Sequence, residues 1–389
     1  MGATVDMQLK TRVIPIIFAG LLLMVGMPCF ANDLPQQATV VAAGKRVADW
    51  QLRQLGYLPG VDPLPEPRVH SRSWEIAAFW IGLARLADFT NESSYRDALL
   101  EQGLRNAWEL GPTLHNADDH AIGQAYLRAA ANGAGDESLA PMRASFDRIL
   151  ADPPVVHLSF YFGEEGYGSA KCLERWCWCD ALFMSPPAMI ELSLVTGDER
   201  YADYAFSEFR ATTDFLFDPV EDLYFRDSRF FGQRDGDGNK LFWSRGNGWV
   251  FAGIANILDI LPPEHPQRDW FEYLYRRMAG RLVELQKDDG YWPPSLLAPA
   301  GSPPETSGTA FFTFGLAFGV NQGLLDAHEF TPAIARGWQA LERSVDDNGR
   351  LGWVQQVSDR PEAVSPDDTH YYGVGAFLLA ATEVAQLTE

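Results

Sequence analysis

Helical segments of two kinds alternate along this 389-residue chain, and the alternation limits the folds that it can adopt. Segment 74–89 is apolar on almost every side, which predicts a helix that is buried all round. The same character recurs in segments 117–130, 248–261, 307–320 and 373–386. A chain with several such helices must surround them with other helices, because so much apolar surface cannot face water.

The second kind of segment is amphipathic. In 271–285 the apolar residues follow steps of three and four, which predicts one buried stripe on a half-exposed helix. Loops with an acidic or glycine turn followed by aromatics recur at a spacing of about 60 residues, a weak internal repeat. These loops are 222–225, 289–292 and 348–353. A helix pair with its loops fits this length. We therefore predict an all-α, single-domain fold, an (α/α)6 barrel of six helical hairpins with a bowl at one end.

The N-terminal residues have the pattern of a secretory signal. Lys10 and Arg12 precede an apolar run, 13–27, and small residues end the segment at Ala31. The run is too short for a transmembrane helix. We predict a signal peptide at 1–31, a catalytic domain at 32–389, and export to a periplasm or to the medium.

Charge restricts the possible partners. The formal net charge of −21 is spread along the chain, which argues against nucleic acid, since phosphate binding needs a basic face. A local arginine cluster can still bind a small anion inside one pocket. No later segment has the length and apolarity of a membrane span. Aromatic residues form 13% of the chain, and tryptophans in polar loops are typical of pockets that stack on sugars. We expect a monomer or a weak dimer.

Cleavage of the signal would leave three cysteines, which do not form a disulfide framework. One bridge, for example between Cys172 and Cys177, fits an oxidising compartment. Zinc is a weaker alternative, because the pair Cys177 and Cys179 lacks a second pair at ligand spacing. We expect neither a metal nor a cofactor.

The segment 176–184 holds the first candidate catalytic carboxylate, Asp180. The neighbouring Trp176, Trp178, Phe183 and Met184 would desolvate this carboxyl group. Desolvation raises the pKa of a carboxylic acid and lets it hold a proton near neutral pH, as a general acid must. The alternative is that Asp180 only caps the helix that follows it. We favour catalysis.

A second acidic motif lies at 115–124. Asn116 or Asp118 could cap the helix that follows, and acids are favoured in a first helical turn. Alternatively, one carboxylate faces the bowl and orients water or a sugar hydroxyl. Adjacent residues on a helix point about 100° apart, so only one of Asp118 and Asp119 should face the site. The sequence does not decide between them. His120 is interpreted as a hydrogen-bonded structural histidine.

Two further segments offer contacts for an anionic sugar. Arg245 and Trp249 are four residues apart and share one face of a helix. The guanidinium can hold a carboxylate by two hydrogen bonds while the indole stacks on the ring. The alternative is that the two side chains only pack on each other. The segment 305–310 could be a capped helix start whose hydroxyls also reach the ligand.

Taken together, these motifs resemble the unsaturated glucuronyl and rhamnogalacturonyl hydrolases of glycoside hydrolase family 105, which is related to family 88. The resemblance extends from Arg72 to Glu383. It rests on five motifs in order, at 118–124, 178–184, 243–249, 305–309 and 372–380. It implies an (α/α)6 barrel without metal. The implied reaction removes a 4,5-unsaturated uronic acid from the non-reducing end of lyase-generated oligosaccharides of rhamnogalacturonan or ulvan type, by hydration of the C4=C5 enol ether.

The resemblance also implies residue roles. Asp180 matches the aspartate that donates a proton to the double bond and activates water, and Asp118 matches its partner, with Asp119 still possible. Where some members have a histidine, this chain has Arg226, and two interpretations are open: Arg226 replaces the histidine as the anion-binding group, or the neighbouring sugar differs. The expected substrate contacts are Trp178, Met184, Arg226, Arg245, Trp249, Lys171 and Thr309. A conventional exo-glycosidase on the same toroid and a non-catalytic sugar-binding protein are the alternatives.

Overall fold

The computed structural model describes residues 1–2, 34–59, 69–164 and 166–388. The basic and apolar parts of the expected signal peptide, and its cleavage site after Ala31, lie outside these described residues. The chain separates into two units, Met1–Ala31 and Asn32–Glu389. All helices discussed below belong to the second unit.

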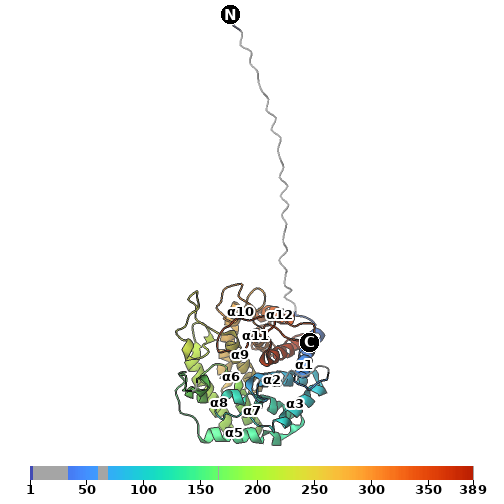
Figure 1. Ribbon diagram of the computed structural model, residues 1–389, viewed down its shortest axis with the longest axis vertical. Helices are drawn as coiled ribbons and strands as arrows, with labels where there is room; N and C mark the ends of the chain where they lie inside the picture. The colour runs from blue at the N-terminus through green and yellow to red at the C-terminus, as the bar shows by residue number, and fades with distance from the viewer. Residues whose placement is uncertain (3–33, 60–68, 165, 389) are drawn as a thin grey trace. The chain divides into compact units, whose positions relative to one another are not determined.

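Helices of this unit form two concentric rings, and the chain passes once around them, as the colours of Figure 1 show. The inner ring consists of α2 (Trp74–Thr90), α4 (Ile122–Ala129), α6 (Ala181–Met184) continued by α7 (Pro186–Thr196), α9 (Ser244–Ile260), α11 (Thr306–Asn321) and α13 (Tyr371–Gln386). The outer ring consists of α1 (Gln37–Gln54), α3 (Ser93–Arg105), α5 (Ala140–Ala151), α8 (Glu199–Leu216), α10 (Arg268–Leu285) and α12 (Ala327–Arg343). Each inner helix packs on the next, and α13 returns to α2. The prediction of an all-α six-hairpin toroid is confirmed.

Short elements connect these helices. Strands β1 (Phe217–Asp218) and β2 (Leu223–Tyr224) pair antiparallel. The short helical turns are η1 (Ala117–His120), η2 (Ala130–Ala134), η3 (Asp136–Leu139), η4 (Tyr167–Ser169), η5 (Lys171–Arg175) and η6 (Ser228–Phe230).

The two predicted kinds of helix match the two rings. Every residue of α11 from Thr306 to Gly319 is buried, and so is α13 from Tyr372 to Ala385. By contrast, α10 buries the single stripe that its sequence period predicts. The segment 117–130 differs from expectation, because the tight turn η1 precedes α4. Asn116 caps this turn by accepting a hydrogen bond from the backbone amide of Asp118.

Ring closure depends on two glycines. A Cβ atom at Gly82 of α2 would collide with the backbone carbonyl of Gly375 in α13, and one at Gly375 would collide with the backbone of Ala78. Only glycine lets the first and last inner helices approach so closely. The first and last inner helices, α2 and α13, are therefore joined by direct backbone contact, which closes the ring.

All inner helices start at the same end of the toroid. The three predicted aromatic loops lie there, within the connections from outer to inner helices at 217–243, 286–305 and 344–370. The carbonyl of Gln355, in the last of these loops, accepts hydrogen bonds from Arg245 at the start of α9 and Tyr372 at the start of α13. At the opposite end, Arg85 near the end of α2 pairs with Asp259 near the end of α9. A bowl at the N-terminal end of the inner ring is the result. Among the described helices, none is both long and apolar enough to cross a membrane.

Candidate active site

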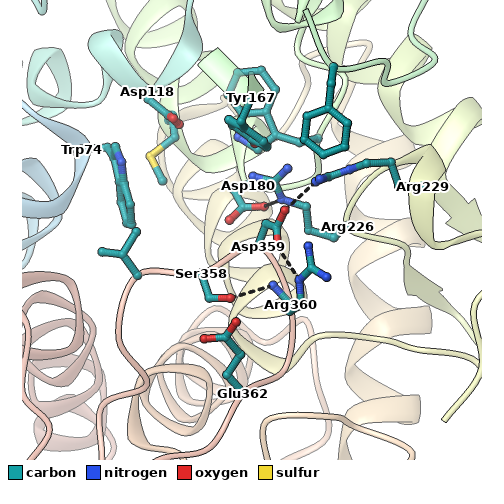
Figure 2. A pocket seen from close by; sticks show the side chains of 14 residues that line it. Trp74, Asp118, Tyr167, Asp180, Arg226, Arg229, Ser358, Asp359, Arg360 and Glu362 are labelled. Carbon is teal, nitrogen blue, oxygen red and sulfur yellow. Dashed lines mark hydrogen bonds and ion pairs between the residues drawn. The ribbon is translucent and has the colours of Figure 1, made fainter. Parts of the chain in front are cut away.

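A cavity of about 570 Å³ opens at the end of the toroid where the inner helices begin. Figure 2 shows acidic, basic and aromatic side chains that converge on it. It is lined by Trp74, Asp118, Phe162, Tyr167, Trp178, Asp180, Met184, Arg226, Arg229, Val357, Ser358, Asp359, Arg360 and Glu362. Five of the ten residues expected to form the site are therefore gathered here: Asp118, Asp180, Trp178, Met184 and Arg226.

Asp180 directly precedes α6, a helix of only four residues because Pro186 opens α7 just after it. Its side chain makes no capping hydrogen bond, so the alternative that it serves as a helix cap is wrong. Only 7% of the residue is exposed. One carboxylate oxygen accepts from the Cys179 thiol at 3.4 Å and lies 3.4 Å from Nε of Arg226. The carboxyl group is thus held at the cavity wall.

The environment of Asp180 raises the pKa of its carboxyl group. Burial is the main cause, because the charged form loses its hydration. The positive charges of Arg226 and Arg245 oppose this rise by stabilising the carboxylate. A raised pKa with a cation beside it gives a group that can both release and recover a proton.

Asp118 provides a second carboxyl group in the same cavity. Burial and the charge of Asp180 raise its pKa to about 8, while Arg226 acts in the opposite direction. Two carboxyl groups that share one arginine cannot both ionise cheaply. In neutral solution the pair therefore holds at least one proton.

The adjacent Asp119 faces away from the cavity. Its carboxylate accepts a hydrogen bond from the backbone amide of Thr113 at 2.7 Å, and its carbonyl accepts from Gly111 at 2.7 Å. It stabilises the loop before η1 and does not line the cavity. Adjacent acids pointing in different directions were expected, and the structure selects Asp118 for the cavity. His120 bonds to the Ser185 hydroxyl at 2.7 Å and the Leu114 carbonyl at 2.8 Å, which confirms a structural histidine.

Arg226 follows strand β2 and is almost fully buried, with 7% of the residue exposed. Its carbonyl accepts a hydrogen bond from the amide of Cys179 at 2.9 Å, which ties it to the segment carrying Asp180. Nη1 donates to Asp227 at 2.9 Å. Nε is buried and finds no hydrogen-bond acceptor among the described residues. Nε lies 3.4 Å from the Asp180 carboxylate as an ion pair, and the guanidinium lines the cavity, where its positive charge is suited to attract an anion.

Arg245 does not line the cavity, contrary to expectation. It is fully buried and donates to the carbonyls of Gln355 at 2.7 Å and Gln356 at 3.0 Å. Its guanidinium lies over the rings of Trp243, at 4.4 Å, and Tyr372, at 4.6 Å. The structure therefore places Arg245 behind the wall, where it anchors the loop that forms one side of the cavity.

Trp249 also lies behind the wall. Its side chain is fully buried and packs on Phe183, at 4.8 Å between ring centroids, and on Phe311, at 4.3 Å. It also contacts Trp74, which lines the cavity, at 6.1 Å. The shared helical face of Arg245 and Trp249 points to neighbouring helices instead of the open bowl.

The two remaining expected contacts are outside the cavity as well. Thr309 is fully buried, accepts from the Trp292 amide at 3.0 Å and donates to the Glu305 carbonyl at 2.6 Å. Hydrogen bonds to local backbone groups thus already engage its hydroxyl as both donor and acceptor. The side chain of Lys171 is 81% exposed and pairs with Glu174 at 3.1 Å. Neither one reaches the carboxyl groups of the site.

Residues 45–388 match the family model described as Glycosyl Hydrolase Family 88. The chain belongs to this family. The resemblance that the five motifs indicated is thereby confirmed, and the protein is a glycoside hydrolase. It is 41% identical over 366 residues to the unsaturated 3S-rhamnoglycuronyl hydrolase of Alteromonas sp. (strain LOR), covering 91% of this chain and 88% of that one. It is 38% identical over 325 residues to the enzyme of the same name from Formosa agariphila, covering 81% and 85%.

A solved structure supports the same assignment. The family 88 glycosyl hydrolase from Bacteroides vulgatus superposes with a TM-score of 0.77 at 25% identity, covering 90% of this chain and 99% of that one. The six-hairpin toroid is thus the shared fold of this glycoside hydrolase and its relative.

Several residues of this glycoside hydrolase site were not anticipated from the sequence. Trp74 begins α2, one of the apolar inner helices, and was interpreted only as core. Arg229 follows Arg226 by three residues in a polar turn, a signal that could have been used. Residues 357–362 come from the loop between α12 and α13, and no local pattern marks them.

A disulfide joins Cys172 to Cys177, just before the segment that carries Trp178 and Asp180. Cys179 is a free, buried thiol. The bridge closes the η5 turn and restricts the conformations of the chain that enters the site. Within the described ranges, no three His, Cys, Asp or Glu side chains are arranged to hold a metal ion.

Proposed function

We propose that this family 88 glycoside hydrolase removes a 4,5-unsaturated uronic acid from the non-reducing end of an oligosaccharide, with rhamnose as the adjoining sugar. The observation that carries the proposal is the position of Asp180. Its carboxyl group makes no capping hydrogen bond and is buried at the cavity wall beside Arg226. The relatives named as unsaturated rhamnoglycuronyl hydrolases support this class of substrate.

The first step is recognition of the uronate carboxylate. Arg226 lines the cavity, and its Nε lies 3.4 Å from Asp180 without forming a hydrogen bond, so the guanidinium keeps charge with which to attract a carboxylate of the substrate. Trp74 is partly exposed and supplies a flat apolar face on which the sugar ring can stack, while Trp178, 1% exposed, forms part of the cavity wall. Binding here places the double bond near Asp180.

The second step is protonation of the alkene. Asp180 gives a proton to C4, which develops positive charge at C5, and that charge is shared with the ring oxygen. Water adds at C5 and returns a proton to Asp180, and the resulting hemiketal opens with release of the aglycone hydroxyl. An acid with a raised pKa is needed for the first transfer, and its conjugate base accepts the second proton.

Asp118 has a different role in this scheme. Its pKa of about 8 keeps it protonated near neutral pH, so it can donate a hydrogen bond to the substrate or to the attacking water. A conventional retaining glycosidase would instead require an ionised second carboxylate as nucleophile. The protonated state of Asp118 favours hydration over displacement.

The test is an ultraviolet assay with a lyase-generated unsaturated uronyl-rhamnose disaccharide. We expect absorbance of the conjugated alkene to decay with the wild type, and Asp180→Asn to lower kcat by about 10²–10⁴-fold without a change in fold. The saturated disaccharide, with an otherwise identical linkage, should be inert. Turnover of the saturated sugar would support the exo-glycosidase alternative, and normal turnover by Asp180→Asn would remove this residue from the mechanism.

We also propose that the mature enzyme acts outside the cytoplasm. Two features support this: the signal-like sequence at 1–31 and the disulfide between Cys172 and Cys177. N-terminal sequencing of the exported protein would test it, with cleavage expected after Ala31.

A further inference from the structure

The proposed reaction makes no use of Cys179, the residue directly before Asp180. Cys172 and Cys177 form a disulfide, whereas Cys179 is a free, buried thiol. Its Sγ lies 3.4 Å from Oδ2 of Asp180, and the thiol is the donor. An S–H group is a weak donor, so this hydrogen bond forms only if the surroundings hold both side chains in place.

The backbone and a neighbouring helix hold the thiol. The amide of Cys179 donates to the carbonyl of Arg226 at 2.9 Å, and none of the cysteine is exposed. A Cβ atom at Gly246, in the first turn of α9, would lie only 3.1 Å from Sγ. The sulfur therefore fills the space that this glycine leaves, which restricts the rotation of the thiol.

Cys179 remains a donor near neutral pH. Burial is the main reason, and the nearby charge of Asp180 adds to it, so that the pKa of the Cys179 thiol is held well above its usual range. The charge of Arg226 opposes this rise without cancelling it. A thiol that keeps its proton can donate to a carboxyl oxygen, but it cannot serve as a base.

The two carboxyl oxygens of Asp180 have different surroundings. Oδ2 accepts from the thiol and lies 3.4 Å from Nε of Arg226, the ion pair that a dashed line marks in Figure 2. Within the described ranges, no side chain of another residue donates a hydrogen bond to Oδ1. A proton on Oδ2 would face two neighbours that already carry hydrogen. The uncharged acid therefore carries its proton on Oδ1.

We propose that Cys179 is a positioning residue, whose thiol acts with Arg226 to engage Oδ2 of Asp180 and leaves the transferable proton on Oδ1. This inference rests on the proposed function and deepens it, because it assigns the atom from which the proton departs. In the first step the O–H bond at Oδ1 breaks and the C4–H bond forms, while the thiol keeps its own proton. The hydrogen bond from the thiol also stabilises the carboxylate that results.

The thiol should also affect the pH at which Asp180 ionises. Burial raises the pKa of Asp180, whereas the charges of Arg226 and Arg245 and the hydrogen bond from Cys179 lower it. Cys179→Ala removes this donor, so the pKa of Asp180 should rise further. Cys179→Ser keeps a donor, and a stronger one, so the pKa should not rise. The other groups that face Asp180 are the same in both variants: Asp118 of η1, Tyr167 of η4, Arg226 after β2 and Arg245 of α9.

The first measurement is the infrared S–H stretching band, which reports hydrogen bonding by the thiol and needs no substrate. In the full chain carrying Cys29→Ser, Cys179 is the one cysteine left with an S–H group. We expect the band to move to lower frequency as rising pH ionises Asp180, since a carboxylate is the stronger acceptor. In Asp180→Ala the band should lie at higher frequency. Asp119→Asn is the matched control, because this carboxylate faces away from the cavity, and it should leave the band unchanged.

The second measurement is the pH profile of kcat/KM for the unsaturated uronyl-rhamnose disaccharide. Asp118 and Asp180 titrate as a coupled pair, so the alkaline limb of the profile reports both. We expect Cys179→Ala to move this limb to higher pH and to lower kcat about two- to tenfold, with KM nearly unchanged. Cys179→Ser should keep kcat near that of the wild type, and its limb should lie at lower pH than that of Cys179→Ala.

The outcomes separate this inference from the proposed function. An S–H band that stays fixed both with pH and in Asp180→Ala overturns the hydrogen bond between the thiol and Asp180. Alkaline limbs that coincide in Cys179→Ala and Cys179→Ser overturn the positioning role. If the wild type does not turn over the unsaturated disaccharide, the proposed function fails, and the infrared band alone decides whether the thiol engages Asp180.

Discussion

Both faces of the toroid, the closed one and the open one, contain charged side chains. They differ in how completely the hydrogen bonds of these side chains are satisfied. At the closed end, Arg85 donates to Glu383 at 2.6 Å and to Asp259 at 2.5 Å, and Asn321 donates to the second oxygen of Glu383 at 2.8 Å. The cavity there is only about 30 Å³. At the open end, Nε of Arg226 finds no acceptor in the described part of the chain, beside a cavity of about 570 Å³.

The difference separates structural charge from functional charge. A buried ion pair with its hydrogen bonds complete closes the space between helices and binds nothing else. A buried cation with a free donor next to an open cavity keeps part of its binding capacity for a ligand. Variants at the two ends should accordingly lose different properties.

The largest expected effect on stability is at the closed end. Arg85→Met leaves the buried carboxylate of Glu383 with Asn321 as its remaining side-chain partner within the described residues, whereas the more exposed Asp259 keeps Arg128. Breaking such a network should lower the free energy of unfolding by about 3–5 kcal/mol. Urea unfolding would measure this loss, while the activity of the folded fraction should stay near that of the wild type. A stable but inactive Arg85→Met would contradict the division between the two ends.

Arg226→Met at the open end should show the opposite pattern, with a large loss of activity and a smaller loss of stability. Losing a charged hydrogen bond to the substrate costs about 1.5–3 kcal/mol, or roughly ten- to hundredfold in kcat/KM. Asp227 keeps Arg229 as a partner, so the loss of stability should be smaller than for Arg85→Met. Arg226 lowers the pKa of Asp180, so its removal should move the alkaline limb of the kcat profile to higher pH. An alkaline limb that stays in place or moves down would argue against Asp180 as the acid.

Of the three variants, Asp118→Asn should change the free energy of unfolding least, and it should increase it. The native pKa of Asp118 is about 8 against an ordinary 3.8, so the native state binds more protons than the unfolded state between these values. Stability therefore falls as pH rises from about 4 to 8, and the uncharged amide removes this loss. We expect a gain in stability at pH 7 that falls to almost none at pH 4, measured by thermal unfolding. Asp119→Asn, the comparison, should gain less stability, because the hydrogen bonds from Thr113 oppose the rise that burial causes in the pKa of Asp119.

Much of the fold could be predicted because it depends on local periodicity. The buried stripe of α10 and the apolar inner helices follow directly from residue spacing. The aspartates at 118 and 180 were found because short polar motifs surrounded them. The choice between Asp118 and Asp119 required the turn η1, whose direction depends on the loop held by Gly111 and Thr113.

The rest of the site depends on contacts between distant segments. Arg245 and Trp249 share a helical face, but the spacing does not say whether this face meets solvent or another helix. Arg245 in fact bonds a carbonyl 110 positions away, and this contact positions the wall that carries Arg360. Loop 357–362 has no helical or strand period of its own, so the sequence does not show that it reaches the cavity.

The glycine contact between α2 and α13 also bears on the order in which this protein can assemble. Gly375 lies 293 residues after Gly82, so the contact between them joins two segments that are far apart in the sequence. A nascent chain emerging from the ribosome cannot complete the ring until helix α13 has been synthesised. Truncation within the last helix should consequently disrupt the whole toroid instead of trimming one edge of it.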